Sequence, residues 1–227
     1  MIELRRFVQS KIKTLSVCSL LLFAVACAGP AASATAGRAS SDPAANLAPG
    51  QAVATFAGGC FWCMQHPFDV IPGVVRTVVG YTGGHTVDPT YEEVSAGGTG
   101  HAESVDVIYN PKKVSYTKLL AVFWHNVDPL AVGHQFCDWG DQYRSEIFYH
   151  SDEQKRLAEA SRAKLAASGV LPGKITTKIV PAGPFYPAEE YHQAYYKKNP
   201  IRYRFYRSGC GRDARLRQLW GAAAGKP

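Results

Sequence analysis

The chain has 227 residues, a formal net charge of +7 and six cysteines. Residues 1–27 contribute +3 of that charge, and no nucleic-acid-binding motif accompanies the remaining +4, so we exclude a nucleic-acid-binding protein. About 170 residues follow the first 50, which is enough for one domain with its own hydrophobic core.

Residues 1–27 predict an export signal. Four basic side chains precede an apolar run over residues 14–26 that is too short to span a bilayer. The segment that ends at Cys27 resembles a bacterial lipobox, in which the cysteine is lipidated, although cleavage after Ala28 or Ala34 would also fit. We therefore expect an exported protein of a bacterium, either periplasmic or held at the envelope by a lipid on Cys27.

Residues 28–50 are rich in Ala, Ser, Gly and Pro and contain almost no large apolar side chains. Such a segment cannot bury enough surface to offset its ordering entropy, so we expect a flexible linker. The globular domain is then residues 51–227.

The domain alternates between strand and helix patterns. Periodicity and turn residues predict, in chain order, a strand at 51–59, a helix at 60–71, a strand at 74–84, a short helix at 90–97, a strand at 102–110, a helix at 115–127, a strand at 143–150, a helix at 151–169, a strand at 174–181 and a last helix at 187–199. This order predicts an α/β fold, an α+β two-layer sandwich with a mixed sheet and flanking helices, but not its exact topology. The long connections at 80–100 and 128–142 are expected to carry function.

The sequence GGCFWC places Cys60 after a strand and at the start of a predicted helix. A thiolate there meets unpaired backbone N–H groups and the positive end of the helix dipole, which lower its pKa. The preceding glycines let the backbone turn tightly. Phe61 and Trp62 either belong to the core or form an apolar pocket beside the thiolate.

Four cysteines fall in the domain, namely Cys60, Cys63, Cys137 and Cys210. They could form two structural disulfides in any of three pairings. A zinc site would need a second cysteine or histidine pair with knuckle spacing, which the chain lacks, although His134 lies three residues before Cys137. A C-x-x-C thiol–disulfide exchange protein would also place its cysteines at a helix start. Residue chemistry alone leaves these alternatives open.

Five ordered blocks indicate a family. The blocks are GGCFWC at 58–63, GYTGG at 80–84, PTYEEVSAGGTGHAE at 89–103, NPKKVSYTKLLAVFWHNVDP at 110–129 and DWGDQYRSEIFYH at 138–150. Together they resemble the peptide methionine sulfoxide reductases of the A type, which are specific for the S-sulfoxide. The resemblance extends from about residue 54 to beyond residue 195, nearly the whole domain, and it implies a ferredoxin-like plait.

The resemblance implies a catalytic pair and a substrate cage. Cys60 falls on the family's nucleophile, which attacks the sulfoxide sulfur and becomes a sulfenic acid. Glu103, in GHAE, falls on the acid that protonates the sulfoxide oxygen; desolvation keeps such a carboxyl protonated. Phe61 and Trp62 then hold the methyl group of the substrate.

Further roles follow from the same resemblance. Tyr81 and Tyr143 fall on hydroxyl donors toward the sulfoxide oxygen, and Asp138 on the active-site aspartate. The chain departs from the commoner pattern at Cys63, where many members have glycine, at Gln65, where many have glutamate, and at Asp141, where threonine is usual.

The sulfenic acid must then be resolved to a disulfide. We favour Cys210 as the resolving thiol over Cys63, with Cys137 third. The resemblance implies recycling by an external thioredoxin-like dithiol, without a metal or organic cofactor. We expect a monomer that acts on methionine sulfoxide, free or in proteins, and so repairs oxidative damage. The alternatives are a C-x-x-C exchange protein and a cysteine-stapled binding lipoprotein with Cys60–Cys63 and Cys137–Cys210 bridges.

Overall fold

The computed structural model of the protein describes residues 43–226. The chain divides into residues 1–37, which lie outside the described part, and a compact unit of residues 38–227 that holds every element below. The export signal at 1–27 and most of the linker at 28–50 therefore lie outside the described residues and stay predictions. The described end of the linker contains one 3-10 turn, Pro43–Asn46. None of the helices between residues 43 and 226 is long and apolar enough to cross a membrane.

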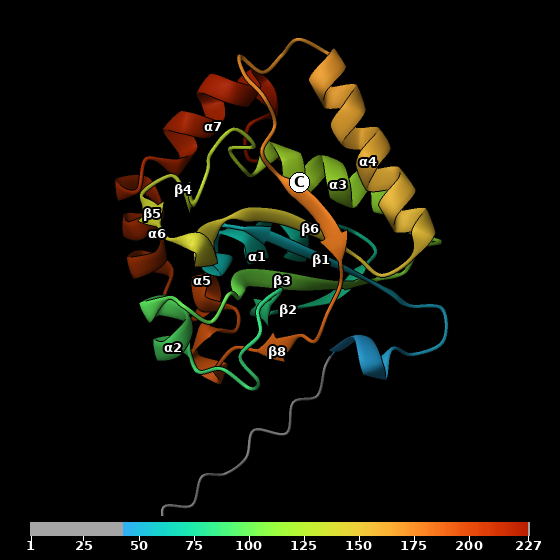
Figure 1. The fold of residues 1–227 in the computed structure, drawn as a ribbon, viewed down its shortest axis with the longest axis vertical. Coiled ribbons are helices and arrows are strands. Elements are labelled where there is room, and N and C mark those ends of the chain that lie inside the picture. The colour runs from blue at the N-terminus through green and yellow to red at the C-terminus, as the bar shows by residue number, and fades with distance from the viewer. Residues whose placement is uncertain (1–42, 227) are drawn as a thin grey trace, which may run out of the picture. The chain divides into compact units, whose positions relative to one another are not determined.

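A six-stranded mixed sheet forms the centre of the unit, with strand order β7-β6-β1-β3-β2-β8 (Figure 1). The strands are β1 (Ala52–Gly58), β2 (Val74–Thr82), β3 (Ala102–Tyr109), β6 (Ser145–Tyr149), β7 (Lys178–Pro181) and β8 (Tyr186–Pro187). Every neighbouring pair is antiparallel except β6 and β7, which are parallel. The inner strands follow the βαββαβ order of a ferredoxin-like plait, so the predicted fold is confirmed.

Helices flank this sheet and close the core. They are α1 (Phe61–Asp69), α2 (Tyr91–Ala96), α3 (Tyr116–His125), α4 (Asp152–Ala167), α5 (Tyr195–Lys198), α6 (Pro200–Gly209) and α7 (Arg212–Trp220). Phe56 of β1 stacks on Phe68 of α1 at 5.1 Å and on Phe123 of α3 at 5.3 Å between ring centroids. Both helices therefore pack on β1, and this packing fixes the position at which α1 begins.

The prediction of one helix at 187–199 is wrong. Pro187 lies in the two-residue edge strand β8, where a missing N–H is tolerated. A 3-10 turn follows at Glu190–His192, and Ala194 has a left-handed φ of 49°, so α5 begins only at Tyr195. Two helices that the sequence analysis did not predict, α6 and α7, then complete the chain.

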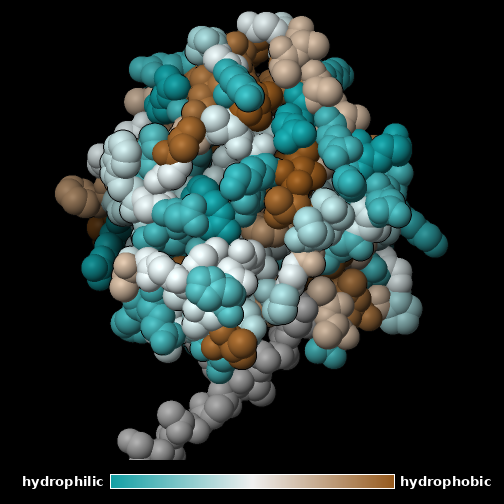
Figure 2. All heavy atoms as spheres, in the orientation of Figure 1, coloured by the Kyte–Doolittle hydropathy of each residue, from teal (hydrophilic) through white to brown (hydrophobic). Residues whose placement is uncertain are grey.

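The predicted long connection at 128–142 contains a small hairpin, β4 (His134–Gln135) and β5 (Asp138–Trp139). On the face shown in Figure 2, hydrophobic residues form several small patches separated by polar ones. The larger apolar side chains lie mainly in the core. Several polar and charged side chains are also buried, and these are the candidates for a functional site.

Candidate functional site

Cys60 lies where the sequence predicts it, as the N-cap residue of α1 directly after β1. The turn depends on Gly59, whose φ is +80° and at which a Cβ would lie 2.5 Å from the side chain of Gln135. Only glycine fits a left-handed conformation with so close a neighbour. The glycine thus lets the chain turn sharply and present the sulfur of Cys60 at the helix start.

The sequence predicts a lowered pKa for Cys60, but the structure indicates the opposite. Cys60 is only 5% exposed and Cys63 only 1%. Burial, together with the neighbouring Cys63, raises the pKa of Cys60 well above its ordinary value. A hydrogen bond from Cys60 and the charges of Arg212 and Arg207 instead lower the pKa of Cys63 to about 6. Both cysteines are free thiols that share a hydrogen bond.

Glu103 on β3 is buried, 3% exposed, and one of its carboxyl oxygens accepts the N–H of Phe61 at 2.9 Å. This contact places the carboxyl one residue from Cys60. Burial raises the pKa of Glu103 to about 8, although the Phe61 N–H opposes that shift. The carboxyl is therefore a proton donor near neutral pH, as the sequence analysis expected of a catalytic acid.

The two aromatic residues after Cys60 lie in different environments. Phe61 is buried and contacts the rings of Tyr81 and His192 at 5.9 and 5.0 Å between centroids. Trp62 is partly exposed, stacks on Tyr195 at 3.8 Å and donates its indole N–H to Nδ1 of His192 at 2.9 Å. Phe61 therefore belongs to the hydrophobic core, and Trp62 presents a partly exposed ring next to Cys60.

His192 was missed by the sequence analysis. Its ring lies against Phe61, Trp62 and Tyr91, the last at 4.5 Å between centroids. The segment that carries it was read as a regular helix, which hid its position. A histidine among closely spaced tyrosines in EYHQAYY was the available signal.

The tyrosines divide differently from the prediction. Tyr81 is fully buried, and its hydroxyl donates to Glu189 at 2.9 Å. Tyr91, at the start of α2, was not predicted; burial and the charges of Glu103 and Cys60 raise its pKa to about 12. Burial, followed by the charges of Glu103, Tyr91 and Cys60, also raises the pKa of Tyr143 above its ordinary value. The structure thus gathers Tyr91 and Tyr143 at the acid and the nucleophile, while the hydroxyl of Tyr81 is already engaged.

Asp138 of β5 lies at the site as expected. It accepts a hydrogen bond from the hydroxyl of Tyr206 on α6 at 2.5 Å, and Tyr206 also hydrogen-bonds the Cys60 side chain. Burial raises the pKa of Asp138. Tyr206 therefore connects the nucleophile to this carboxyl group, a role that no sequence motif indicated.

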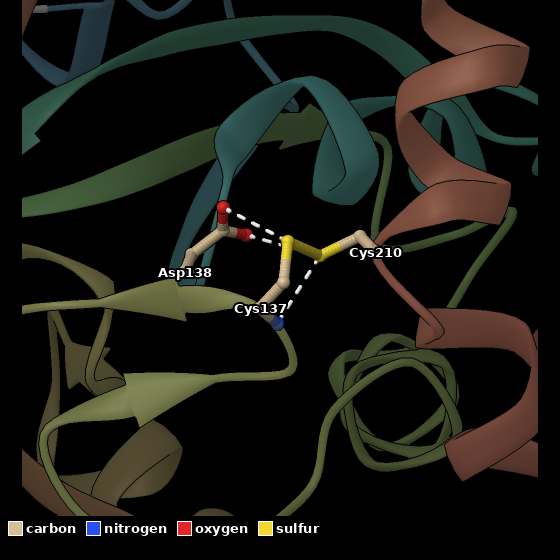
Figure 3. A group of neighbouring side chains, drawn as sticks. All are labelled: Cys137, Asp138 and Cys210. Atoms are coloured by element: carbon tan, nitrogen blue, oxygen red, sulfur yellow. Dashed lines mark hydrogen bonds between the residues drawn. A yellow bond between two sulfur atoms is a disulfide. The ribbon is translucent and has the colours of Figure 1, made fainter.

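Cys137 and Cys210 form a disulfide next to Asp138 (Figure 3). Asp138 Oδ1 lies 3.7 Å from the sulfur of Cys137, and Oδ2 lies 3.9 Å from that of Cys210. Cys137 is exposed in the β4–β5 turn, and Cys210 is half-buried between α6 and α7. Cys210 thus lies at the junction of two helices. One bridge of the cysteine-stapled alternative is present, whereas Cys60 and Cys63 are not bonded to each other.

Arg212, the first residue of α7, is 1% exposed. Its guanidinium donates to the carbonyl oxygens of Gly58 at 3.1 Å and Asn126 at 3.0 Å, and it lies 4.2 Å from the ring centroid of Phe136. Within residues 43–226 no carboxylate lies within 4.0 Å of it. A buried cation without an acidic partner is costly, and its field must act on the nearest ionisable groups.

Within residues 43–226, one group of side chains has its potential metal-ligand atoms close together. There, Cys137, Asp138 and Cys210 are the group whose ligand atoms lie within 4.8 Å of one another. Two of those atoms are disulfide sulfurs, which have no thiolate to offer a metal. His134 stacks on Trp139 at 4.3 Å instead of joining this group.

Two of the three departures from the family pattern, at Gln65 and Asp141, have local explanations. Gln65 is buried, donates to Thr77 at 3.0 Å and accepts the N–H of Ala194 at 2.8 Å, so its amide needs both a donor and an acceptor. Asp141 is exposed and forms an ion pair with Arg144 at 3.0 Å. That pairing balances part of the charge that Asp141 would otherwise present to a substrate.

The profile of the family described as peptide methionine sulfoxide reductase matches residues 52–224. The chain belongs to the peptide methionine sulfoxide reductase family. It is 55% identical over 169 residues to the peptide methionine sulfoxide reductase MsrA of Bacillus licheniformis, covering 74% of this chain and 93% of that protein. The MsrA of Bacillus subtilis is also 55% identical, over 75% of this chain and 96% of its own.

Two solved structures of the reductase family share the fold. Methionine sulfoxide reductase A of Corynebacterium diphtheriae has 38% identity and a TM-score of 0.61, over 68% of this chain and 77% of that one. Mxr1 of Saccharomyces cerevisiae in its reduced form has 36% identity and a TM-score of 0.62, over 69% and 90% of the two chains. The family match includes all four cysteines of the domain, so both cysteine pairs lie within the reductase fold.

Proposed function

We propose that this domain reduces the S-sulfoxide of methionine, free or in proteins, to methionine with Cys60 as the nucleophile. The observation that carries the proposal is the hydrogen bond between the Phe61 N–H and Glu103, because it holds a protonated carboxyl beside the sulfur of Cys60. A sulfoxide needs both partners at once, a nucleophile for sulfur and an acid for oxygen.

The reaction begins as the substrate methyl group enters beside Trp62. Cys60 attacks the sulfoxide sulfur while Glu103 protonates the oxygen, with the hydroxyls of Tyr91 and Tyr143 donating to that oxygen. Methionine then leaves, and the oxygen remains on Cys60 as a sulfenic acid. Tyr91 takes the role that the sequence analysis gave to Tyr81, because the hydroxyl of Tyr81 is bonded to Glu189.

Cys63 resolves the sulfenic acid in this account. It is a free thiol hydrogen-bonded to Cys60, whereas Cys210 is bonded to Cys137 and has no thiol to offer in this state. Attack of Cys63 on the Cys60 sulfur expels water and forms a Cys60–Cys63 disulfide. The order therefore differs from the preference for Cys210, which we assign to the next step.

Recycling uses the Cys137–Cys210 pair and an external thioredoxin-like dithiol. The dithiol reduces the exposed bridge by exchange, and the freed Cys210 thiol then attacks the buried Cys60–Cys63 disulfide. Cys60 and Cys63 return as thiols, and Cys137–Cys210 is restored as a disulfide. The contact chain from Cys60 through Tyr206 and Asp138 to this bridge supports the route.

The test is turnover of single methionine sulfoxide diastereomers with dithiothreitol as reductant. We expect consumption of the S form, none of the R form, and loss of activity in Cys60→Ser. If the wild type reduces neither diastereomer but reduces disulfides of other proteins, the C-x-x-C exchange alternative is correct instead.

We further infer that the protein acts as a monomer outside the cytoplasm, on methionine residues of envelope or periplasmic proteins. The basic and apolar pattern of residues 1–27 supports export. Fractionation of cells that carry the full chain, with and without Cys27→Ser, tests the lipid anchor. The wild type should enter the membrane fraction and the variant should not. Equal distribution of both would exclude the anchor.

A further inference from the structure

We propose that a cleft beside the Cys60 site, with Trp139 on one wall, binds the polypeptide chain that flanks the methionine sulfoxide of a protein substrate. The proposal rests on the proposed function, because it specifies how the same site recognises an oxidised polypeptide and not only the free amino acid. Trp139 is then a specificity-determining residue that acts on the substrate chain and not on the reacting atoms.

The cleft has a volume of about 420 Å³ and lies between two segments of the chain. One wall is residues 94–101, from the last turn of α2 to the residue before β3, and the other is residues 139–142, from the end of β5 into the 3-10 turn that precedes β6. Ligand-binding clefts have volumes of about 300–1,000 Å³. The space therefore suits a short length of extended chain and is too small for a folded protein.

Both walls continue directly into the catalytic residues. Trp139 follows Asp138, and Gln142 precedes Tyr143. The other wall ends two positions before Glu103. Consecutive Cα atoms are about 3.8 Å apart, so the backbones of these wall residues lie within roughly 8 Å of catalytic ones. An extended peptide advances about 3.3–3.6 Å per residue, so residues two or three positions from the methionine sulfoxide reach the cleft.

Side chains brace the two walls against each other. Gln142 donates to the carbonyl oxygen of Ser95 at 3.1 Å, and Arg144 donates to that of Gly100 at 3.0 Å. Arg144 is also paired with Asp141 at 3.0 Å. A cleft whose walls are already fixed needs little ordering when a ligand enters, which favours binding.

Trp139 gives this cleft its apolar surface. Its ring stacks on His134, its cross-strand partner, at 4.3 Å between centroids and an interplanar angle of 13°. Nδ1 of His134 in turn donates to the carbonyl oxygen of Val132 at 3.0 Å. Trp139 nevertheless remains 71% exposed, so one face of the indole is held by the protein while the other is open. Tryptophan is among the residues that dominate binding at interfaces, and an apolar side chain of the substrate can pack on this open face.

The glycine-rich wall offers main-chain donors. Gly98 and Gly100 have φ angles of +87° and +73°, and within residues 43–226 the N–H groups of Gly98, Thr99 and Gly100 donate to no other group. An extended peptide has carbonyl oxygens that can accept from such groups. Main-chain hydrogen bonds bind a peptide irrespective of its sequence. Such binding suits an enzyme whose substrates share only an oxidised methionine.

The experiment measures kcat/KM with dithiothreitol for free methionine S-sulfoxide and for a tripeptide and a heptapeptide that carry this residue at the centre, with alanine and leucine around it. In Trp139→Ala, the ratio of kcat/KM for the heptapeptide to that for the free amino acid should fall about tenfold. Trp139→Phe should restore most of this ratio. The corresponding ratio for the tripeptide should change much less, because its flanking residues do not reach the cleft.

The matched control is Val170→Ala, which shortens an exposed apolar side chain beyond the end of α4 and should leave both ratios unchanged. An unchanged heptapeptide ratio in Trp139→Ala, or an equal loss with the tripeptide, would overturn the proposal. A loss that appears only when a thioredoxin replaces dithiothreitol would also overturn it, because Trp139 would then bind the reductant. A wild type that reduces no sulfoxide of any length contradicts the proposed function, and this inference with it.

Discussion

The two cysteine pairs of this domain differ in burial more than in chemistry. Cys60 and Cys63 are free thiols with almost no exposed surface at the start of α1, whereas Cys137 is exposed and bonded to Cys210. A buried pair can hold a small sulfoxide away from water, but a protein reductant cannot reach it. The exposed Cys137 of the other pair is accessible to such a reductant. The division suggests that the chemical step and the recycling step are carried by separate pairs, joined by Tyr206 and Asp138.

The largest effect should come from the buried pair. Cys60→Ser is expected to lower the rate of sulfoxide reduction by roughly three orders of magnitude or more, the scale reached when a covalent nucleophile is removed. The rate should fall equally with dithiothreitol and with a thioredoxin, because the lost step precedes recycling. Substantial activity in Cys60→Ser would show that the buried pair does not supply the nucleophile.

The acid should come next. Glu103→Gln keeps an oxygen for the Phe61 N–H but has no proton to donate, so the rate should fall by about 10²- to 10⁴-fold. Retention of wild-type kcat/KM by this variant would exclude Glu103 as the acid.

The same carboxyl predicts the pH dependence. Because Glu103 donates a proton and its pKa is about 8, kcat/KM of the wild type should fall as the pH rises through that value. Because the pKa of Glu103 is raised in the folded state, its burial destabilises the fold as the pH rises from about 4.5 through 8. Between pH 6 and 9, the Glu103→Gln variant should therefore lose less stability than the wild type, as measured by thermal unfolding. Parallel losses would contradict the burial argument.

The exposed pair should affect one reductant selectively. Cys137→Ser is expected to reduce thioredoxin-supported turnover strongly, and dithiothreitol-supported turnover much less, because a small dithiol can enter where a protein cannot. The ratio of the two rates is the measurement, with Ser168→Ala, a residue at the far end of α4, as the matched control. Equal losses with both reductants would place Cys137–Cys210 outside the recycling route.

The smallest effect separates two tyrosines. Tyr91→Phe should slow the reaction roughly tenfold, the equivalent of one lost hydrogen bond of about 1.4 kcal/mol to the transition state. Tyr81→Phe should instead lower the stability by about 1–2 kcal/mol, since Glu189 loses its buried donor. Steady-state rates and urea unfolding of both variants distinguish the two roles. A slow but stable Tyr81→Phe with a fast but destabilised Tyr91→Phe would return the donor role to Tyr81.

Much of this arrangement could be predicted from the sequence. The helix start at Cys60, the position of Glu103 on its strand and the order of the main strands all follow from local patterns and ordered motifs. The raised pKa of Cys60 could not, because it depends on burial and on a hydrogen bond with Cys63, which only the folded structure shows.

The C-terminal third was the least predictable region. A helical pattern continued through 187–199, yet Pro187 pairs with β2 and Ala194 adopts a left-handed backbone, so tertiary contacts override local propensity there. As a result His192 and Tyr206, which both reach the site, were not identified from the sequence.

In the proposed reaction, oxygen passes from the substrate to Cys60. The direct measurement is mass spectrometry of reduced Cys63→Ser protein after one equivalent of methionine S-sulfoxide, in the presence of a cyclic 1,3-diketone that traps sulfenic acids. The account predicts one methionine released per chain and the adduct on Cys60. An adduct on Cys137 or Cys210, or methionine release without any adduct on Cys60, would contradict it.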